Sequence, residues 1–223
     1  MKAKELKILR KRLVKANRCD ELLKGFDYDT TFSLNTTGGV NDESESLESD
    51  SAGRRNNLSI IFAPASQITE KRSNECLDLF ERNMGEMYRN SSWGLNMEEK
   101  AAELRDNKAR FLIVLDDNEK LAGFVHFRFE YDDEECPTCA VLYIFEIQIE
   151  STYRRCGVGK RLMGIAELIG REQSMTKLLL TVFKSNHQAM TFYTKTLGYN
   201  IDESSPSKFG ESVDYEILSL ELL

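Results

Sequence analysis

The sequence predicts an α/β fold that follows a basic helical segment at the N-terminus. Segments with strand character alternate with segments of helical periodicity from residue 58 to the end of the chain. The apolar run at 141–149 then leads through a glycine turn into a helix with one apolar face. A length of 223 residues suits one domain with appendages, and a hydrophobic content of 41% is adequate for its core.

The first 26 residues are strongly basic and carry a helical pattern. One helical stripe contains Leu6, Leu9, Leu13 and Ala16 or Asn17. Two compatible interpretations follow. One is a nuclear-localisation or anion-binding patch, and the other is a helix whose leucine stripe packs on the main domain. We assign residues 1–35 to this basic helical segment.

Residues 36–57 are rich in Ser, Gly, Asn, Asp and Glu and poor in apolar side chains. Such a segment cannot bury enough surface to offset the entropy cost of ordering, so we expect an acidic, disordered linker. The folded domain is then expected at residues 58–223.

The main domain shows a regular order of elements. Strands are predicted at residues 58–62, 111–115, 121–129, 141–149, 177–183, 199–202 and 213–220. Helices are predicted at residues 69–90, 96–106, 160–171 and 186–197. Asn96 and Glu99 form a capping-box pattern at the start of the second helix, and Gly198 is a typical residue to end the last one.

Composition narrows the class of protein. No apolar run is long enough to span a membrane, and the basic N-terminus lacks the apolar stretch of a signal peptide. The net charge is -7, whereas nucleic-acid binders of this size are normally basic. An acidic body suits a basic partner through electrostatic steering, although a charge that only maintains solubility is the commoner case.

Five scattered cysteines fit a reducing compartment with free thiols. Cys136 and Cys139 form an isolated C-x-x-C pair, and neither histidine supplies a second pair of ligands. We interpret the cysteines as structural or incidental and predict no metal site.

The glycine turn contains the clearest chemical signal. Its pattern from Arg154 to Gly159 is R-x-x-G-x-G, which fits neither the nucleotide P-loop nor the dinucleotide fingerprint. The first amides of a helix have no internal partner, and the helix dipole adds positive charge there. Gly157 and Gly159 have no side chain to keep a diphosphate from the backbone. The alternative is an ordinary surface turn with two glycines.

The R-x-x-G-x-G pattern resembles the acetyl-CoA pyrophosphate loop of the GCN5-related N-acetyltransferases (GNAT), and the order of elements matches that fold. The resemblance implies a mixed central sheet whose two middle strands splay apart near Glu150 and Phe183, with acetyl-CoA in the gap. It implies pyrophosphate binding by the backbone of Arg155, Cys156, Gly157, Val158, Gly159 and Lys160. It also implies that the backbone of Ile147, Gln148 and Ile149 pairs with the cofactor like an added strand.

A second stretch resembles the fourth-helix signature of the same family. It consists of Asn186, Ala189 and the pair Phe192-Tyr193. The resemblance implies that Asn186 contacts the pantetheine arm and that Tyr193 lies near the thioester sulfur. A thiol of pKa near ~8.5 is helped to leave by a proton donor, so Tyr193 is the candidate general acid. By periodicity alone, Tyr193 would be a core aromatic residue.

Several segments go beyond the general pattern of the family: Met87-Tyr88, Ser92-Trp93-Gly94, Phe127-Arg128-Phe129, 143–150, 180–184 with 186–187, and 201–202 with 204–207 and 215–218. In this order they resemble the histone-specific N-terminal acetyltransferases of this family (type D), and the resemblance covers roughly residues 58–218. The implied reaction acetylates the α-amine of histone H4 and of the core histone that shares its Ser-Gly-Arg-Gly start. By this resemblance Glu146 is the catalytic glutamate. An α-amine of pKa near ~8 must lose a proton before it attacks, so Glu146 is the candidate general base.

The same resemblance implies a set of substrate-binding residues: Tyr88, Trp93, Glu130, Tyr143, Phe145, Thr181, Ser204 and Tyr215. Two positions depart from the family, because Glu130 replaces an aspartate and Phe145 replaces the usual tyrosine. Trp93 is nearly as well explained as a packing anchor. The acids at 130–135 suit a substrate arginine, or they form a solvated loop.

The expected partner is therefore a basic histone N-terminal peptide, with acetyl-CoA as co-substrate. We expect no direct nucleic-acid binding, no membrane contact, and a monomer without an auxiliary subunit in the nucleus and cytoplasm. Two alternatives stay open: a GNAT enzyme for lysine side chains or small amines, and a non-catalytic module that binds acetyl-CoA or histone tails.

Overall fold

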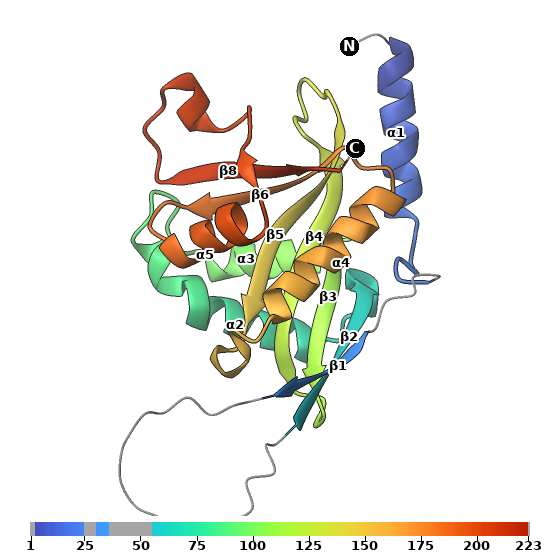
Figure 1. Cartoon of the computed structure of the whole chain (residues 1–223). Helices are drawn as coiled ribbons and strands as arrows, with labels where there is room; N and C mark the ends of the chain where they lie inside the picture. The colour runs from blue at the N-terminus through green and yellow to red at the C-terminus, as the bar shows by residue number, and fades with distance from the viewer. Residues whose placement is uncertain (1–2, 25–29, 36–54, 223) are drawn as a thin grey trace, which may run out of the picture.

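The computed structural model describes residues 3–24, 30–35 and 55–222, and within them eight strands form one mixed sheet (Figure 1). The strand order is β1-β2-β3-β4-β5-β6-β8-β7, and the β5–β6 pair is parallel while the other pairs are antiparallel. The strands are β1 Thr31–Asn35, β2 Arg55–Pro64, β3 Arg110–Asp116, β4 Leu121–Tyr131, β5 Ala140–Ile149, β6 Lys177–Phe183, β7 Asn200–Ile201 and β8 Tyr215–Glu221.

Helices cover both faces of this sheet (Figure 1). They are α1 Ala3–Asn17, α2 Glu70–Arg89, α3 Met97–Arg105, α4 Val158–Glu172 and α5 His187–Thr191. Short 3₁₀ turns lie at Ala65–Gln67, Ser151–Tyr153 and Pro206–Phe209, and a π-helical turn at Phe192–Thr196 continues α5. Helices α2 and α3 pack on one face, and α1 and α4 pack on the other. None of the helices in the described ranges combines the length and apolarity that a bilayer crossing requires.

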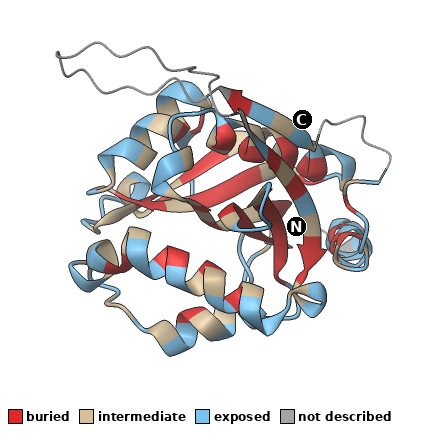
Figure 2. Cartoon of the chain, turned by 90° about the horizontal axis from the view of Figure 1, so that it is seen from below, coloured by how far each residue is buried: buried red, intermediate tan, exposed pale blue. Residues whose placement is uncertain are grey.

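Two apolar clusters hold the layers together, and buried residues concentrate along the strands in Figure 2. The larger lies between the sheet and helices α1 and α4, with Phe127, Leu142 and Ile165 among its members. The smaller lies under α2 and α3 and includes Leu79 and Phe124. Apolar packing against helices therefore stabilises the sheet on both of its faces.

The sequence predicted the amino-terminal cap of α3, and the structure shows a cap of the same kind on α2. Asn96 accepts hydrogen bonds from the amides of Glu98 and Glu99 at 3.1 and 3.2 Å and so caps α3. Thr69 does the same for α2, with the amide of Arg72 at 3.2 Å. The predicted strands and helices of the main domain are otherwise present with shifts of a few residues at their ends.

The N-terminal region differs from the prediction in three ways. The segment at 31–35, expected within the helical region, is strand β1 and pairs with β2. Strand β2 starts at Arg55, so the last three residues of the expected linker belong to the sheet. Residues 36–54 of that linker lie outside the described ranges. In α1, Leu9, Leu13 and Ala16 are buried as predicted, but Leu6 is 42% exposed.

The predicted last helix is α-helical only in its first half. Leu197 donates its amide to the carbonyl of Phe192, five residues back, as in a π-helix. The hydroxyl of Thr194 donates to the carbonyl of Met190 at 2.8 Å and competes for the acceptor that an α-helical amide would use. Gly198 follows with a positive φ of 78°, as expected for a helix end.

The two central strands separate, as the family resemblance implies. Strand β5 pairs with β6 from Val141 to Ile144, and no register continues between them beyond that point in the described chain. Strand β5 stays paired with β4 as far as Ile149, and β6 stays paired with β8 as far as Phe183. The result is a gap between the carboxyl ends of two adjacent strands.

A bulge marks the point of separation. His126 of β4 lies opposite Glu146, but Phe127 lies opposite Ile144, so Phe145 is an extra residue in β5. Before the bulge, Ile144 faces the α4 side with the larger cluster. After it, Glu146 faces the α3 side, where it contacts Lys100. The bulge thus turns Glu146 away from the apolar core that its strand position would otherwise assign to it.

Candidate active site

A cleft of about 520 Å³ opens where β5 and β6 separate. Helix α2, the glycine turn and the α5 region complete its walls. Of the predicted site residues, the following line it: Tyr88, Trp93, Phe145, Glu146, Ile147, Gln148, Ile149, Arg155, Gly157, Gly159, Lys160, Thr181, Asn186 and Tyr193. The remaining ones lie outside this lining: Glu130, Tyr143, Cys156, Val158, Ser204 and Tyr215.

The glycine turn presents backbone amides to one end of the cleft. Gly157 has a φ of +85°, in the left-handed region that a side chain disfavours, and α4 begins at the next residue. A methyl group on Gly159 would lie 3.2 Å from Ile149 Cδ1 and 3.3 Å from Phe192 Cζ, so this position is closely packed. Free amides at the start of a 15-residue helix suit a diphosphate.

Side chains of the turn have separate tasks. Arg154 donates to the carbonyl of Ile149 at 3.0 Å and to the side chain of Asn83, which ties the turn to β5 and α2. Val158 is buried in the larger core cluster, so only its backbone is available to a ligand. Cys156 is exposed, and its thiol contacts the carbonyl of Arg154 at 3.3 Å.

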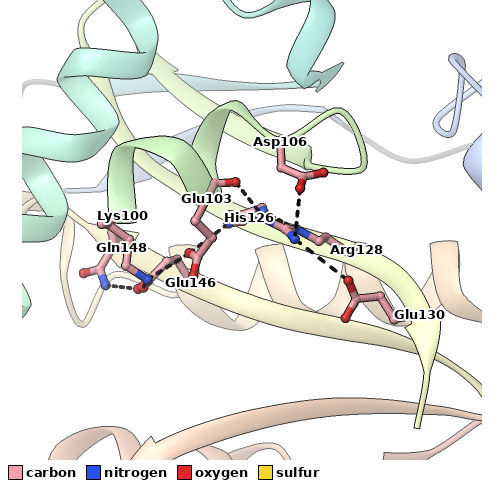
Figure 3. Close-up of polar contacts among 8 residues, drawn as sticks. All are labelled: Lys100, Glu103, Asp106, His126, Arg128, Glu130, Glu146 and Gln148. Atoms are coloured by element: carbon pink, nitrogen blue, oxygen red, sulfur yellow. Dashed lines mark hydrogen bonds and ion pairs between the residues drawn. The ribbon is translucent and has the colours of Figure 1, made fainter. Parts of the chain in front are cut away.

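Glu146 lines the cleft with a buried carboxylate, and Figure 3 shows its polar contacts. Its Oε1 accepts from Lys100 Nζ at 2.9 Å, and its Oε2 accepts from Gln148 Nε2 at 2.7 Å. Burial raises the pKa of Glu146, while Lys100 and Gln148 act in the opposite direction. The site thus contains a carboxylate that is both more basic than a free glutamate and fixed in orientation.

Lys100 reaches Glu146 from α3. Its ammonium also contacts Glu103 Oε1 at 2.8 Å and lies 4.8 Å from the ring centre of Phe80. Burial acts to lower the pKa of Lys100, but the carboxylates of Glu146 and Glu103 outweigh it and raise that pKa. Lys100 is therefore a cation at neutral pH. Lys100 was not among the residues predicted from the sequence. Its position four residues before the buried Leu104 places both side chains on the helix face that points to the sheet.

A second polar group lies beside the bulge (Figure 3). Phe145 stacks on His126 with 4.9 Å between ring centres, and the Arg128 guanidinium lies 4.4 Å from the Phe145 ring centre. Burial, aided by nearby cations, lowers the pKa of His126 well below its ordinary value, so its ring is neutral. Glu130 lies 3.9 Å from Arg128, and burial raises its pKa. Neither His126 nor Arg128 was assigned a role from the sequence, although Arg128 belongs to the segment Phe127-Arg128-Phe129 that carries part of the family resemblance.

An aromatic cluster of Tyr88, Trp93, Phe183 and Tyr215 adjoins the cleft, and all of these residues except Tyr215 line it. Trp93 is 49% exposed, and its ring centre lies 5.0 Å from those of Phe183 and Tyr215. Tyr88 lies 5.1 Å from Phe183 and 6.0 Å from Trp93. The structure thus brings three of the predicted substrate residues together, and both interpretations of Trp93 are compatible with this contact.

Four other predicted residues, Tyr143, Ser204, Tyr193 and Asn186, have surroundings of their own. The Tyr143 hydroxyl shares a hydrogen bond with Thr181. Ser204 donates to Asp202 Oδ1 at 2.6 Å and belongs to a turn after β7. Tyr193 is buried in the lining of the cleft, and burial, with a contribution from Glu146, raises its pKa, so its hydroxyl keeps its proton at neutral pH. Asn186 uses its side-chain oxygen to cap α5, with the Ala189 amide at 3.1 Å.

The described residues contain no group of three His, Cys, Asp or Glu side chains that could hold a metal ion. Cys136 and Cys139 are free thiols. Burial raises the pKa of Cys139 to about 11, so its thiol is not activated as a nucleophile.

Splayed strands, an anion-binding helix start and a buried carboxylate between them define a class of acyl-transfer enzyme that takes a coenzyme A ester. A family model described as "Acetyltransferase (GNAT) family" matches residues 73–199, more than half of the chain. The chain belongs to the GNAT family of acetyltransferases.

Two curated relatives are N-terminal acetyltransferases. The chain is 25% identical to N-alpha-acetyltransferase 40 of Saccharomyces cerevisiae over 74% of its own length and 63% of that protein. It is 27% identical to the N-terminal acetyltransferase A complex catalytic subunit NAA10 of Arabidopsis thaliana over 47% of its length and 54% of the relative. The chain thus spans less than two thirds of either relative.

Solved structures share the fold. A GNAT-family acetyltransferase from Staphylococcus aureus Mu50 superposes with a TM-score of 0.56 at 14% identity, and covers 74% of this chain and 100% of that one. PaiA N-acetyltransferase from Thermoplasma acidophilum, in complex with coenzyme A, superposes with a TM-score of 0.51 at 15% identity, over 74% and 98% of the two chains. The predicted α/β GNAT fold with its mixed, splayed sheet is confirmed.

Acetyl-CoA is the co-substrate of this family, and the residues present fit it. The left-handed Gly157 has no neighbouring atom within 4 Å of the position that a Cβ would take, so the backbone at the start of α4 is open to a diphosphate. The edge of β5 from Ile147 to Ile149 has no β6 partner in the described chain, so its backbone can pair with an extended ligand. When bound, acetyl-CoA supplies an activated acetyl group as a thioester.

Proposed function

We propose that this acetyltransferase acts on the α-amine of a peptide that begins with Ser-Gly-Arg-Gly, the start of histone H4 and of one other core histone. The observation that carries the proposal is the buried carboxylate of Glu146 in the cleft, beside the gap between the central strands. The likeness to N-alpha-acetyltransferase 40 supports an α-amine as acceptor. The sequence resemblance to the histone-specific branch supports the peptide.

Glu146 has the chemistry that an α-amine requires. Such an amine, with a pKa near ~8, is partly protonated at neutral pH and must release a proton to become nucleophilic. Because burial raises the pKa of Glu146, its carboxylate is a better proton acceptor than one in water. The protonated hydroxyl of Tyr193 is the candidate donor to the departing thiolate.

The aromatic cluster and the acids beyond it suit the remainder of the peptide. Tyr88 and Trp93 line the cleft, where a small first residue and its backbone can pack against them, and Tyr215 contacts the Trp93 ring from outside that lining. Glu130 pairs with Val141 of β5, before the Phe145 bulge, and its carboxylate can bind a basic third residue of the peptide. The substrate contact would then replace the contact of Glu130 with Arg128. A lysine side chain, with a pKa near ~10.4, would need a stronger base.

Mass spectrometry of a Ser-Gly-Arg-Gly-Lys peptide, incubated with the enzyme and acetyl-CoA, tests this proposal. A second peptide has the same sequence with a blocked α-amine. We expect one acetyl group on the free peptide and none on the blocked one. Acetylation of the blocked peptide would instead assign lysine chemistry, and transfer to neither peptide would refute the proposed substrate.

The matched variants are Glu146→Gln and Glu172→Gln. The first removes the proposed base and should lower kcat/KM by about 100-fold or more, as expected for loss of a general base. The second changes an exposed carboxylate at the far end of α4 and should leave the rate unchanged. Full activity of Glu146→Gln would exclude Glu146 as the base.

A further inference from the structure

We propose that Lys100 is the positioning residue of this active site: it holds Glu146 ionised and oriented, and together with Glu103 it sets the pH range in which the enzyme works. This inference rests on the proposed function, in which Glu146 is the general base. It assigns a role to two α3 residues that do not line the cleft.

The geometry of α3 aims Lys100 at the carboxylate. Lys100 lies one turn before the buried Leu104, so both side chains project from the same face of the helix toward the sheet. The Lys100 side chain is only 9% exposed, and its ammonium lies 2.9 Å from Glu146 Oε1 and 2.8 Å from Glu103 Oε1. A lysine is rarely buried this far unless it has an anionic partner, and here one partner is Glu146, the proposed base.

Lys100 contacts one carboxylate oxygen of Glu146 without lining the cleft, and both oxygens of Glu146 accept hydrogen bonds that fix its orientation. The second oxygen accepts from Gln148 Nε2 at 2.7 Å, and Gln148 in turn accepts from Asn83 Nδ2 at 2.9 Å. Each carboxylate oxygen can accept more than one hydrogen bond, so capacity for the substrate amine remains. The donors come from α3, α2 and β5, which are elements of the rigid core rather than loops.

The charge around Glu146 comes from several elements. Helix α3 contributes Lys100 and Glu103, α2 contributes Tyr88, the π turn contributes Tyr193, and β4 places His126 opposite. The two tyrosines and the histidine are neutral, because burial raises the pKa of each tyrosine and lowers the pKa of the histidine. Among the described residues, Lys100 is the one cation in ion-pair contact with Glu146.

Opposite effects of two α3 substitutions follow from this arrangement. Lys100→Met removes the cation, so the buried Glu146 becomes harder to ionise. Glu103→Gln removes the anion that shares the ammonium, so Lys100 acts on Glu146 alone and Glu146 becomes easier to ionise. A merely structural role for the pair would not move a titration in opposite directions.

The test is the pH dependence of kcat/KM for peptide acetylation. For Lys100→Met we expect the acid limb to move up by about one pH unit or more, the shift typical of losing an opposite charge at this distance. For Glu103→Gln we expect it to move down, and for Lys100→Arg, which keeps the charge, we expect most of the wild-type profile. Glu103→Gln retains the Lys100–Glu146 pair, so the test stands even where Lys100→Met does not fold.

A second readout needs no substrate. The carboxyl ¹³C signal of Glu146, assigned by its loss in Glu146→Gln, is titrated by NMR in the wild type and in the same variants. Its midpoint should rise in Lys100→Met and fall in Glu103→Gln. Unchanged midpoints, or shifts in the same direction, would overturn the inference whichever peptide the enzyme acetylates. If the Ser-Gly-Arg-Gly peptide is not acetylated but the midpoints move as described, the proposed substrate fails while the role of Lys100 stands.

Discussion

A buried ion pair near the C-terminus gives a stability prediction with a definite pH dependence. Lys177 Nζ lies 2.6 Å from Asp202 Oδ2, and Ser204 donates to Asp202 Oδ1 at 2.6 Å. Burial alone would raise the pKa of Asp202, but the hydrogen bonds from Lys177 and Ser204 lower it from 3.8 to about 2. The pair fastens the turn after β7 to the start of β6.

The magnitude follows from that shift. A carboxyl group whose pKa is lower in the folded state stabilises the fold above its unfolded pKa, here 3.8, and loses that contribution as the pH falls toward 2. The whole shift corresponds to about 2.4 kcal/mol. Solvent screening at the partly exposed Lys177 reduces our expectation for Asp202→Asn to about 1–2 kcal/mol. In a chain of this size that lowers Tm by about 2–8 °C at pH 7.

Urea denaturation of the wild type and Asp202→Asn between pH 6 and pH 3 provides the assay. The difference in the free energy of unfolding should fall by about half at pH 3. Asp78→Asn is the matched control, since Asp78 is exposed on α2 and should show a small, constant difference. A difference for Asp202→Asn that is the same at pH 3 and pH 6 would refute the ionic origin of the stabilisation.

Substitutions at Gly123 and Asn186, each with a control, test the packing behind the cleft and its lining. Gly123→Ala places a methyl 2.7 Å from the Gln148 carbonyl oxygen and should lower the free energy of unfolding by about 1–3 kcal/mol. Gly85→Ala meets only the side chains of Arg89 and Glu81, at 3.2 and 3.3 Å, which can shift; it should be neutral or stabilising by up to about 1 kcal/mol. An unchanged Tm for Gly123→Ala would contradict this packing argument. Asn186→Ala should lose about 1 kcal/mol of cap stability and raise the KM for acetyl-CoA, whereas Asn186→Ser should restore stability but not KM; recovery of both would leave Asn186 with capping alone.

Features that depend on neighbours in sequence were predictable. The turn from Arg154 to Gly159 was recognisable because its glycine spacing, the preceding strand and the following helix all lie within 32 residues, 141–172. The caps at Thr69 and Asn96 depend on amides two or three residues away. Local chemistry of this kind is written directly into the order of residues.

Features that depend on pairing across the sheet were not predictable. Strict alternation along β5 assigns Glu146 to the same face as Leu142 and Ile144. The Phe145 bulge reverses that assignment, and it is visible only in the register with β4. Strand β1 was missed for a similar reason, since five residues with alternating Phe32 and Leu34 gain strand geometry only by pairing with β2.

The bulge and the buried lysine solve one problem together. A carboxylate that accepts a proton from an amine must remain ionised although it is buried, and a nearby cation favours the ionised form. A cation on the substrate side of Glu146 would repel the protonated substrate amine. Because the bulge turns Glu146 toward α3, Lys100 can neutralise the carboxylate from a position that does not line the cleft. The extra residue at Phe145 therefore keeps the Lys100 ammonium, which favours the ionised form of Glu146, out of the cleft in which Glu146 would accept the proton.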